Sequence, residues 1–464
     1  MFDWIVIGGG SAGYAAARTG HSLGLKTAVV DGGAELGGLC ILRGCMPSKT
    51  LLESASRFRS LRRAEEFGLR VSNPEIRGKE IIARKRRLIG EFAGYRAGQL
   101  EDGRFTLYRG KASFLDENRI EVTLREGGTV TLEGRAFCLA TGSEVWIPDL
   151  PGLKETPYWT SDDVLDAEEI PESIAVLGGG AIAMELAHYY EGLGRKVTVL
   201  QRSAHVLSNM DTDLAEAVEK ASRSRDIDLH TGVKLMRTDV VPEGVAVRYS
   251  HEGHEKVVTA ERLLVALGRK PAIGGLNLEA AGIKTQTGKI TVELTQASSQ
   301  PHIFAAGDVC GPYDVVHTAI TQGEIAARNA ARFLGKLSGE DEQRDDRLKL
   351  YGVFTHPQVA AVGLSEKDAI ANGRKVVTAS YPFDDHGKSL VIGEPEGLVK
   401  MIADAETKEL IGAAAAGPEA VELIHEMSVA LHFRCTALEF LQIPHYHPTL
   451  SEIWTYPAEE IAEA

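Results

Sequence analysis

Residues 2–13 read Phe-Asp-Trp-Ile-Val-Ile-Gly-Gly-Gly-Ser-Ala-Gly, and this stretch decides the fold. A short apolar run that stops at glycines is typical of a buried strand. The glycines follow the pattern Gly-x-Gly-x-x-Gly. Gly8 permits a tight turn, Gly10 lets the backbone approach a pyrophosphate, and Gly13 lets the next helix pack close to the strand. The stretch therefore predicts the first strand and turn of a dinucleotide-binding α/β domain.

The residues that follow complete this unit. Residues 14–23 form an expected helix, and residues 26–30 form a second strand that ends at Asp31. A carboxylate at that position accepts hydrogen bonds from the ribose of a dinucleotide. A glycine-rich turn without a ligand is the structural alternative, but strand, helix and acid together favour a nucleotide site.

The same design occurs a second time. The strand 174–177 leads to Gly178, Gly180 and Ala183, and the strand 196–200 follows the helix. An internal duplication of the nucleotide-binding unit predicts that the protein holds two dinucleotides.

The second strand of the duplicated unit ends in different residues from the second strand of the first unit. Gln201 occupies the place of the ribose-binding acid, and Arg202 follows it. Loss of the carboxylate together with a guanidinium favours a 2′-phosphate, so the sequence leans toward NADP. A solvated arginine is the alternative, and the choice between NAD and NADP stays open.

Two cysteines lie four residues apart in residues 37–52, Gly-Gly-Leu-Cys-Ile-Leu-Arg-Gly-Cys-Met-Pro-Ser-Lys-Thr-Leu-Leu. Pro47 predicts the first turn of a helix, so Cys40 and Cys45 straddle a helix N-terminus. Free amides and the positive end of the dipole favour a thiolate there, and we expect a lowered thiol pKa. A structural disulfide or two buried thiols is the alternative. The remaining cysteines are expected to pack in apolar surroundings: Cys138, Cys310 and Cys435.

Three further turns follow buried strands and suit a chain that returns beside a dinucleotide. They read Ala-Thr-Gly, Ala-Leu-Gly-Arg and Ala-Gly-Asp along the chain. The acid of the third turn lies where it can bind the sugar chain of the first nucleotide. The residues concerned are Thr141, Gly142, Gly268, Gly307 and Asp308.

Near its end the chain reads His-Tyr-His-Pro-Thr-Leu-Ser-Glu over residues 445–452. Histidine titrates near neutral pH, and a carboxylate can fix its tautomer, which makes His447 a candidate proton shuttle and Glu452 its orienter. A satisfied structural histidine is the alternative. No cysteine or second histidine cluster completes a set of metal ligands, so we expect no metal.

Length and charge restrict the classes of function that fit the sequence. The chain has 464 residues, with 51 Lys and Arg against 65 Asp and Glu, a net charge of −14. That charge argues against nonspecific binding to nucleic acid or anionic membranes. No apolar run approaches the roughly 20 residues of a membrane span. The chain opens directly into a strand without a leader pattern, which predicts a cytoplasmic location.

The fold class expected is α/β, with two Rossmann-like nucleotide-binding domains and a C-terminal α+β domain that builds an interface. Residues 54–110 are expected to be mainly helical, and residues 256–265 to form one strand. Proline clusters and strand ends place the boundaries. The expected parts are a first nucleotide-binding domain with the cysteine pair (1–148), a second nucleotide-binding domain (149–270), a central segment that completes the first domain (271–345) and a C-terminal interface domain (346–464).

With both cysteines, both fingerprints and the His-Pro-Thr-Leu-Ser-Glu motif in order, the sequence resembles the flavoprotein pyridine nucleotide-disulfide oxidoreductases over its full length. The resemblance implies FAD and NAD(P) as cofactors and a homodimer with shared active sites. It implies that the four expected parts are, in order, an FAD-binding domain with a redox disulfide, an NAD(P)-binding domain, the rest of the FAD domain and a dimerisation domain. It implies FAD contacts from Gly8, Gly10, Gly13, Asp31, Lys49, Thr141 and Asp308. It implies nicotinamide-nucleotide contacts from Gly178, Gly180, Ala183, Glu185 and Arg202.

The resemblance also implies roles in catalysis. Cys40 becomes the sulfur that exchanges with substrate, Cys45 the sulfur against the flavin, and His447 the base held by Glu452. The reaction implied carries electrons from a dithiol of the dihydrolipoyl type through the disulfide and FAD to NAD(P). Lys49 and Glu185 are expected to form an ion pair.

Two other readings stay open. Arg43 between the cysteines and Tyr446 beside His447 differ from dihydrolipoyl-oxidising members, which leaves an NADPH-driven reductase of another small disulfide or a quinone as an alternative. A flavin-binding sensor or interaction protein without turnover is the alternative of another class. The sequence does not name the disulfide, the direction of the reaction or a larger complex.

Overall fold

The computed structural model describes residues 1–464, and the chain divides into two compact units. Unit 1 comprises residues 1–50, 82–146 and 269–345, and unit 2 comprises residues 51–81, 147–268 and 346–464. No helix is long and apolar enough to cross a membrane. The fourfold division into domains and the cytoplasmic location stay predictions.

Unit 1 is built on a six-stranded sheet in which β1 lies parallel to β2 and β5, as the apolar fingerprint strand requires. β4 pairs antiparallel with β3 and β5. The sheet contains β1 (Phe2–Ile7), β2 (Thr27–Asp31), β3 (Thr106–Phe114), β4 (Arg119–Leu124), β5 (Thr129–Leu139) and β18 (Ile303–Ala305). Smaller pairs join β6 (Ser143–Val145) to β15 (Arg269–Pro271) and β16 (Thr285–Gln286) to β17 (Lys289–Ile290).

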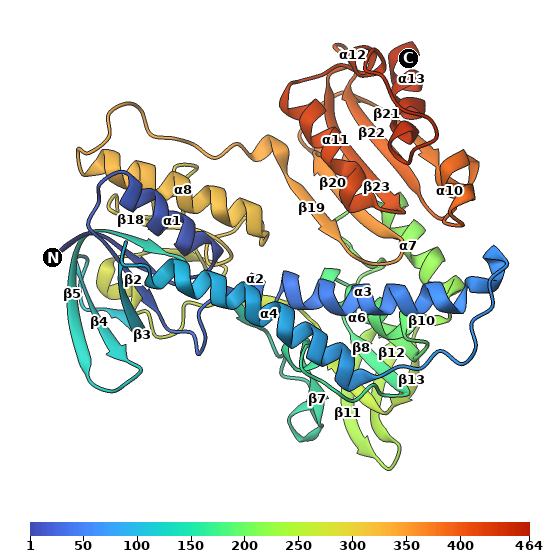
Figure 1. Ribbon diagram of the computed structural model, residues 1–464, viewed down its shortest axis with the longest axis horizontal. Coiled ribbons are helices and arrows are strands. Elements are labelled where there is room, and N and C mark those ends of the chain that lie inside the picture. Colours follow the sequence, from blue (N-terminus) through green and yellow to red (C-terminus); the bar gives the residue numbers. More distant parts are fainter. The chain divides into compact units, whose positions relative to one another are not determined.

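Two helices of unit 1, α1 (Ser11–Ser22) and α8 (Val316–Phe333), lie side by side (Figure 1). A Cβ on Gly323 would come within 2.2 Å of the Ala12 carbonyl oxygen, so the two backbones touch where glycine allows it. The region 54–110 contains the long helix α4 (Gly78–Glu101). The last residues of this region belong to strand β3 and not to the expected helix.

Unit 2 contains the second nucleotide-binding sheet, with strand order β10-β9-β8-β14-β7 and all pairs parallel. Its elements are β7 (Tyr158–Trp159), α5 (Ser161–Val164), β8 (Ser173–Leu177), α6 (Ala181–Gly192), β9 (Lys196–Leu200), α7 (Thr212–Ser224), β10 (Ile227–His230) and β14 (Arg262–Val265).

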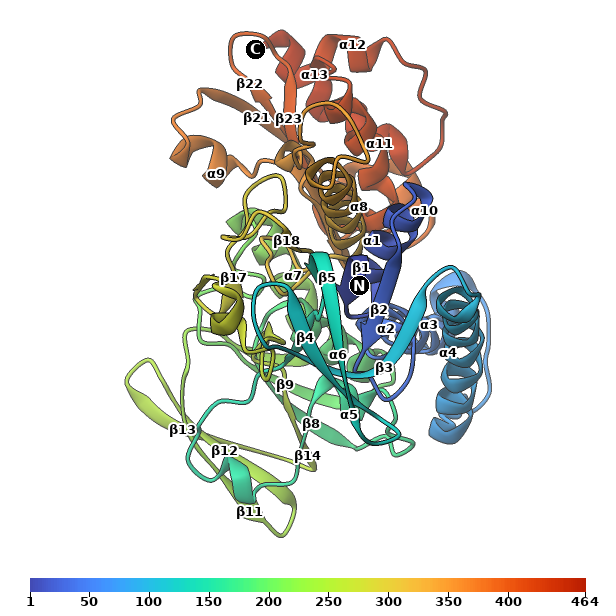
Figure 2. The same ribbon diagram turned by 90° about the vertical axis from the view of Figure 1, so that its left-hand side faces the viewer.

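A separate antiparallel sheet joins β11 (Lys234–Val241), β12 (Gly244–His251) and β13 (His254–Ala260), and Figure 2 shows it as a distinct layer. The prediction of one strand over residues 256–265 was wrong, because β13 ends at Ala260 and β14 begins at Arg262 in the other sheet. A continuous apolar run does not reveal such a change of sheet.

The C-terminal part of unit 2 is a five-stranded antiparallel sheet in the order β19-β20-β23-β22-β21, packed against α11. Its core is rich in alanine and closes around Phe383, Phe440 and Trp454. The elements are β19 (Leu350–Val353), β20 (Gln358–Gly363), α9 (Glu366–Ala371), β21 (Val376–Pro382), α10 (Gly387–Val391), β22 (Leu398–Asp404), β23 (Leu410–Gly417), α11 (Ala420–His432), α12 (Ala437–Leu441) and α13 (Thr455–Glu463).

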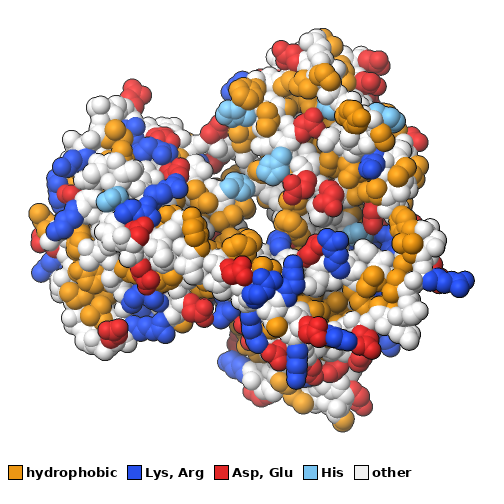
Figure 3. Space-filling view, viewed as in Figure 1, with side chains coloured by type: hydrophobic (Ala, Val, Ile, Leu, Met, Phe, Trp, Pro, Cys, Tyr) orange, Lys and Arg blue, Asp and Glu red, His pale blue; other side chains and the backbone are white.

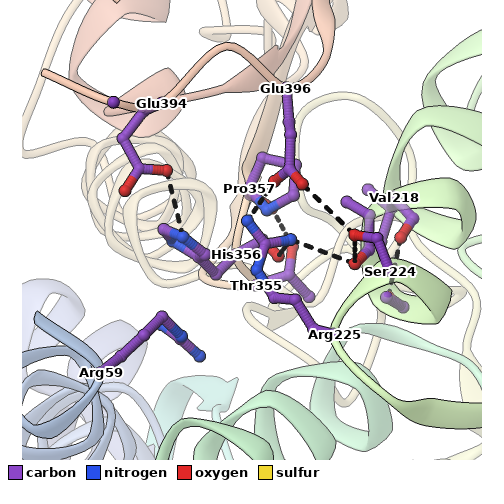
Figure 4. A network of polar contacts seen from close by, with 12 residues as sticks. Arg59, Val218, Ser224, Arg225, Thr355, His356, Pro357, Glu394 and Glu396 are labelled. Carbon is purple, nitrogen blue, oxygen red and sulfur yellow. Dashed lines mark hydrogen bonds and ion pairs between the residues drawn. The ribbon is translucent and has the colours of Figure 1, made fainter. Parts of the chain in front are cut away.

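A polar network connects the helical and C-terminal segments within unit 2. Arg225 donates to the His356 carbonyl oxygen at 3.1 Å and pairs with Glu396, and His356 Nε2 lies 3.1 Å from Glu394 Oε2 (Figure 4). Burial lowers the pKa of His356. The positive charges of Arg59 and Arg225 lower this pKa further, whereas Glu394 raises it. The network therefore holds a neutral histidine among paired charges.

Acidic and basic side chains are interspersed on the face that Figure 3 shows.

Candidate active site

The two closely spaced cysteines lie on consecutive helices of the chain. Cys40 belongs to the short helix α2 (Gly38–Leu42), and Cys45 is the first residue of α3 (Cys45–Arg62), as the position of Pro47 predicts. Both are half-buried free thiols, and Cys40 makes a side-chain hydrogen bond with Cys45. The two thiols therefore lie within hydrogen-bonding reach of each other.

The pKa of Cys40 is raised, whereas the sequence predicts a lowered value. The hydrogen bond with Cys45 is the largest cause and burial the next, while the charge of Lys49 acts against both. Two thiols in contact share a proton, because removal of the second proton would place two negative charges side by side. The helix N-terminus alone does not decide the protonation of this pair.

The cysteine helix lies directly on the first glycine loop. Gly38 has a φ of +73°, and a Cβ on it would stand 2.4 Å from the Cα of Gly10. Only glycine permits both that backbone conformation and that approach. The sequence analysis did not assign a role to Gly38, although the Gly-Gly pair before Cys40 was a signal for it.

The first loop has the features of a dinucleotide cradle. Gly8 has a φ of +109°, and a Cβ on it would meet the Ala140 carbonyl oxygen at 2.3 Å. A Cβ on Gly13 would lie 1.8 Å from the Gly8 carbonyl oxygen. Asp31 accepts from the Gly9 N–H at 2.8 Å through Oδ2, and each carboxylate oxygen keeps a second lone pair.

The turn at the end of β5 offers an unpaired polar atom to this cradle. The hydroxyl of Thr141 is buried and has no hydrogen-bond partner in the protein. Such a group is typical of a ligand-binding site, where the ligand supplies the partner. Gly142, with a φ of +71°, has open space around it. These residues fit a bound FAD.

The Gly307–Asp308 turn is held by side chains that the sequence analysis missed. Ser143 donates to Asp308 Oδ2 at 2.7 Å, and Arg269 donates to the Ser143 hydroxyl at 2.9 Å. Burial raises the pKa of Asp308, and the hydrogen bond from Ser143 opposes the rise. Gly307 donates its N–H to Gln322 Oε1 at 2.7 Å. The Asp308 carboxylate thus has a fixed orientation. No sequence signal connected it to Ser143.

The second loop repeats the first in unit 2. Gly178 has a φ of +115°, and its Cβ would meet the Ala266 carbonyl oxygen at 2.4 Å, the counterpart of the contact between Gly8 and Ala140. Gly180 and Gly268 have open space around them. Ala183 is buried behind the loop, with its Cβ only 3.6 Å from where a Cβ on Gly178 would stand. The open backbone fits a second dinucleotide.

Gln201 lies against the glycine loop, where its Cδ would be 2.9 Å from a Cβ on Gly179. Its Oε1 accepts from the Arg202 N–H at 3.1 Å, and its Nε2 donates to the His205 carbonyl oxygen at 3.3 Å. Gln201 therefore takes the position of Asp31 with an amide instead of a charge. Arg202 is exposed beside it.

Glu185 is buried on α6, and its Oε1 accepts from the Phe354 N–H at 2.9 Å. Lys49 is half-buried on α3. The expected ion pair between Lys49 and Glu185 stays a prediction.

His447 and Glu452 are brought together in unit 2. His447 Nδ1 lies 2.9 Å from Glu452 Oε2, with the His447 side chain 79% exposed and that of Glu452 13% exposed. The carboxylate fixes the proton on Nδ1 and leaves Nε2 toward solvent. His445 is a satisfied structural histidine, since its ring nitrogens contact Ile443 O and Glu426 Oε1, each at 2.9 Å.

Comparison with known proteins gives matches over nearly the whole chain. The family model described as pyridine nucleotide-disulphide oxidoreductase matches residues 2–323, and its dimerisation domain matches residues 351–458. A dihydrolipoyl dehydrogenase of Thermus scotoductus is 36% identical over 97% of this chain and 95% of its own. A mercuric reductase of Staphylococcus aureus is 34% identical over 94% of this chain and 78% of its own.

Among solved structures, the Cu(II) complex of the HOCl-induced flavoprotein disulfide reductase RclA from Escherichia coli superposes with a TM-score of 0.85. It covers 99% of both chains at 25% identity. The expected fold class, two nucleotide-binding domains and a C-terminal dimerisation domain, is confirmed.

Proposed function

Since this chain belongs to the pyridine nucleotide-disulphide oxidoreductases, we propose that it carries electrons between a dithiol of the dihydrolipoyl type and NAD(P) through Cys40 and Cys45. The family assignment makes it a dihydrolipoyl dehydrogenase-like flavoprotein enzyme that uses FAD and NAD(P) and forms a homodimer through its dimerisation domain. The individual residue roles, the substrate and the sharing of active sites between subunits are parts of the proposal.

The residues that would hold FAD are those of the first cradle. The glycines would admit the pyrophosphate, Asp31 would accept from the ribose, and Asp308 would accept from the sugar chain. Thr141 would find in FAD the partner that its hydroxyl lacks. The second loop, with Gly178, Gly180, Ala183, Glu185 and Arg202, would hold the nicotinamide nucleotide. When bound, FAD would supply the two-electron chemistry that links the cysteine dithiol to NAD(P).

The chain's own residues carry the thiol chemistry. His447 accepts a proton at Nε2 from the substrate dithiol, and the resulting thiolate attacks Cys40 in the oxidised pair. The Cys40–Cys45 bond breaks and a mixed disulfide forms, with Cys45 leaving as a thiolate. The second substrate thiol then attacks the substrate sulfur of the mixed disulfide, and its proton passes to the departing Cys40 sulfur. The substrate leaves as a disulfide, and the cysteine pair keeps the two electrons as the Cys40 thiol and the Cys45 thiolate.

Glu452 holds His447 throughout this exchange. Its carboxylate keeps the proton of the neutral ring on Nδ1 and stabilises the imidazolium once Nε2 has accepted a proton. In the homodimer His447 would serve the cysteine pair of the other subunit.

The observation that carries the proposal is the hydrogen bond between the Cys40 and Cys45 thiols, with Cys40 on the helix α2 that touches the first glycine loop. The test is an anaerobic titration of the holoenzyme. An active pair takes up four electrons per FAD and gives a long-wavelength thiolate-to-flavin band, whereas Cys45→Ser takes up two. Cys435→Ser, a cysteine remote in sequence, is the control and keeps four. An uptake of two electrons by the native enzyme would refute the proposal.

A second candidate is an NADPH-driven reductase of another small disulfide or a quinone. The uncharged Gln201 with the exposed Arg202 favours it. Steady-state rates with NADH and NADPH against a panel that includes lipoamide decide between the two. Arg202→Ala should raise the KM for NADPH by about 10- to 150-fold and leave that for NADH unchanged, because one charge-assisted contact is worth about 1.5–3 kcal/mol.

A further inference from the structure

A buried histidine stands on the inner side of Glu452. His386 is 0% exposed, and its Nε2 lies 3.6 Å from Glu452 Oε1. The same carboxylate contacts His447 on its outer side at 2.9 Å and 3.1 Å. Glu452 therefore lies between one exposed imidazole and one buried imidazole.

The His386 ring is fixed from behind. Its Nδ1 lies 2.8 Å from the hydroxyl of Ser389, which is fully buried on α10. The ring also meets Phe383 and Tyr456 edge to face, with centroids 6.4 Å away in both cases. These contacts hold the ring in place, so its second nitrogen keeps its direction toward Glu452.

The His386 nitrogen that faces Glu452, Nε2, has no hydrogen-bond partner elsewhere in the fold. His386 Nε2 is buried and has no hydrogen-bond partner, because 3.6 Å to the carboxylate is just beyond a formed hydrogen bond. A buried polar atom without a partner costs about 1–3 kcal/mol. The tautomer with hydrogen on Nε2 places that hydrogen, and not a lone pair, against the carboxylate.

The charge state follows from the groups around the ring. Burial lowers the pKa of His386. The negative charge of Glu452 raises this pKa, and the nearby His447 lowers it further. Tyr456 on α13 faces the ring edge, while Asp385 on the same segment is bonded by the Tyr381 hydroxyl at 2.8 Å. A neutral ring whose Nε2 hydrogen points toward the Glu452 carboxylate, 3.6 Å away, is the state these neighbours favour at pH 7.

We propose that His386 is a positioning residue that holds Glu452 from the protein interior and so sets how strongly His447 binds a proton. An N–H dipole that points at Glu452 from 3.6 Å on the inner side stabilises part of the carboxylate charge and so weakens its pull on His447. Loss of that donor leaves the full charge to the outer imidazole, which then holds its proton more tightly. This inference rests on the proposed role of His447 as the base.

The test compares two substitutions that each keep one half of the imidazole. His386→Asn keeps a polar atom near Nδ1, toward Ser389, and loses the side that faces Glu452. His386→Gln places an amide nitrogen near Nε2. The readout is the pH midpoint of imidazole C2 hydrogen–deuterium exchange at His447, measured by mass spectrometry on the full-length FAD-loaded dimer. It requires no turnover, so it remains informative if the proposed reaction is wrong.

The midpoint should rise by about 0.5 unit in His386→Asn, about a threefold gain in proton affinity, and return to the native value in His386→Gln. The acid limb of kcat/KM for dithiol oxidation should move by the same amount. Equal midpoints in the native enzyme and both variants would overturn the inference, as would equal shifts in both variants, which indicate a structural role alone. Ser389→Ala, which frees the ring without removing it, should shift the midpoint in the same direction. An unchanged midpoint in that variant likewise counts against the inference.

Discussion

Replacement of Glu452 with glutamine removes one negative charge beside His447 and keeps an oxygen of nearly the same shape. Two unit charges about 4 Å apart attract by about 1 kcal/mol in water and about 4 kcal/mol at a protein surface with an effective dielectric constant of 20. The His447 side chain is 79% exposed and that of Glu452 13% exposed, so the pair lies between these limits. We take about 2 kcal/mol as the loss, which corresponds to about a 30-fold slower proton-coupled step.

The assay separates the two half-reactions in a stopped-flow instrument. Reduction of the enzyme by the dithiol should slow by about 30-fold in Glu452→Gln, while reduction by the nicotinamide nucleotide should keep its rate. Glu459→Gln makes the same change at an exposed carboxylate on α13 and is the matched control. A loss below threefold, or an equal loss in both half-reactions, would refute the reasoning from the contact of Glu452 with His447.

Three further predictions concern stability and cofactor binding. Arg59 and Glu191 form a buried pair at 2.7 Å, so Arg59→Met should lower the free energy of unfolding by about 3–5 kcal/mol in urea titrations, and Glu191→Gln in addition should restore part of the loss. Burial lowers the pKa of both His188 and His356 below the usual 6.5. The unfolded chain therefore binds more protons than the folded one below pH 6.5, and the thermal midpoint should fall as the pH drops from about 7 to 5, less steeply in His356→Gln. Gly13→Val should abolish FAD binding, measured by flavin absorbance after gel filtration, because its Cβ would overlap a carbonyl oxygen at 1.8 Å. FAD retention by this variant would contradict the packing described.

Local sequence was enough to predict much of the framework. β1 spans residues 2–7 and ends at glycines, and β9 spans residues 196–200 and ends at Gln201, as the apolar runs and the residues after them indicate. The pairing of His447 with Glu452 was also predictable, because both residues lie in one short motif. In such stretches the residues that make the contact are close along the chain, so spacing alone carries the information.

The parts that sequence did not predict depend on contacts between distant segments. Gly38 touches Gly10 only because α2 folds back on the first loop, and no periodicity records that approach. The protonation of Cys40 depends on the proximity of Cys45 and on burial, which outweigh the helix terminus. His386 sits in a polar turn that reads as surface, yet the ring is completely buried.

The contact between Gly38 and Gly10 has a mechanical consequence. Gly10 and Gly38 have no side chains, so their backbones pack directly against each other. The spacing between α2 and the nucleotide loop therefore does not change when nearby side chains change rotamer. The distance between the cysteine-bearing helix α2 and the first glycine loop is accordingly set by main-chain atoms. Substitutions of other side chains on α2 should therefore leave this backbone spacing unchanged.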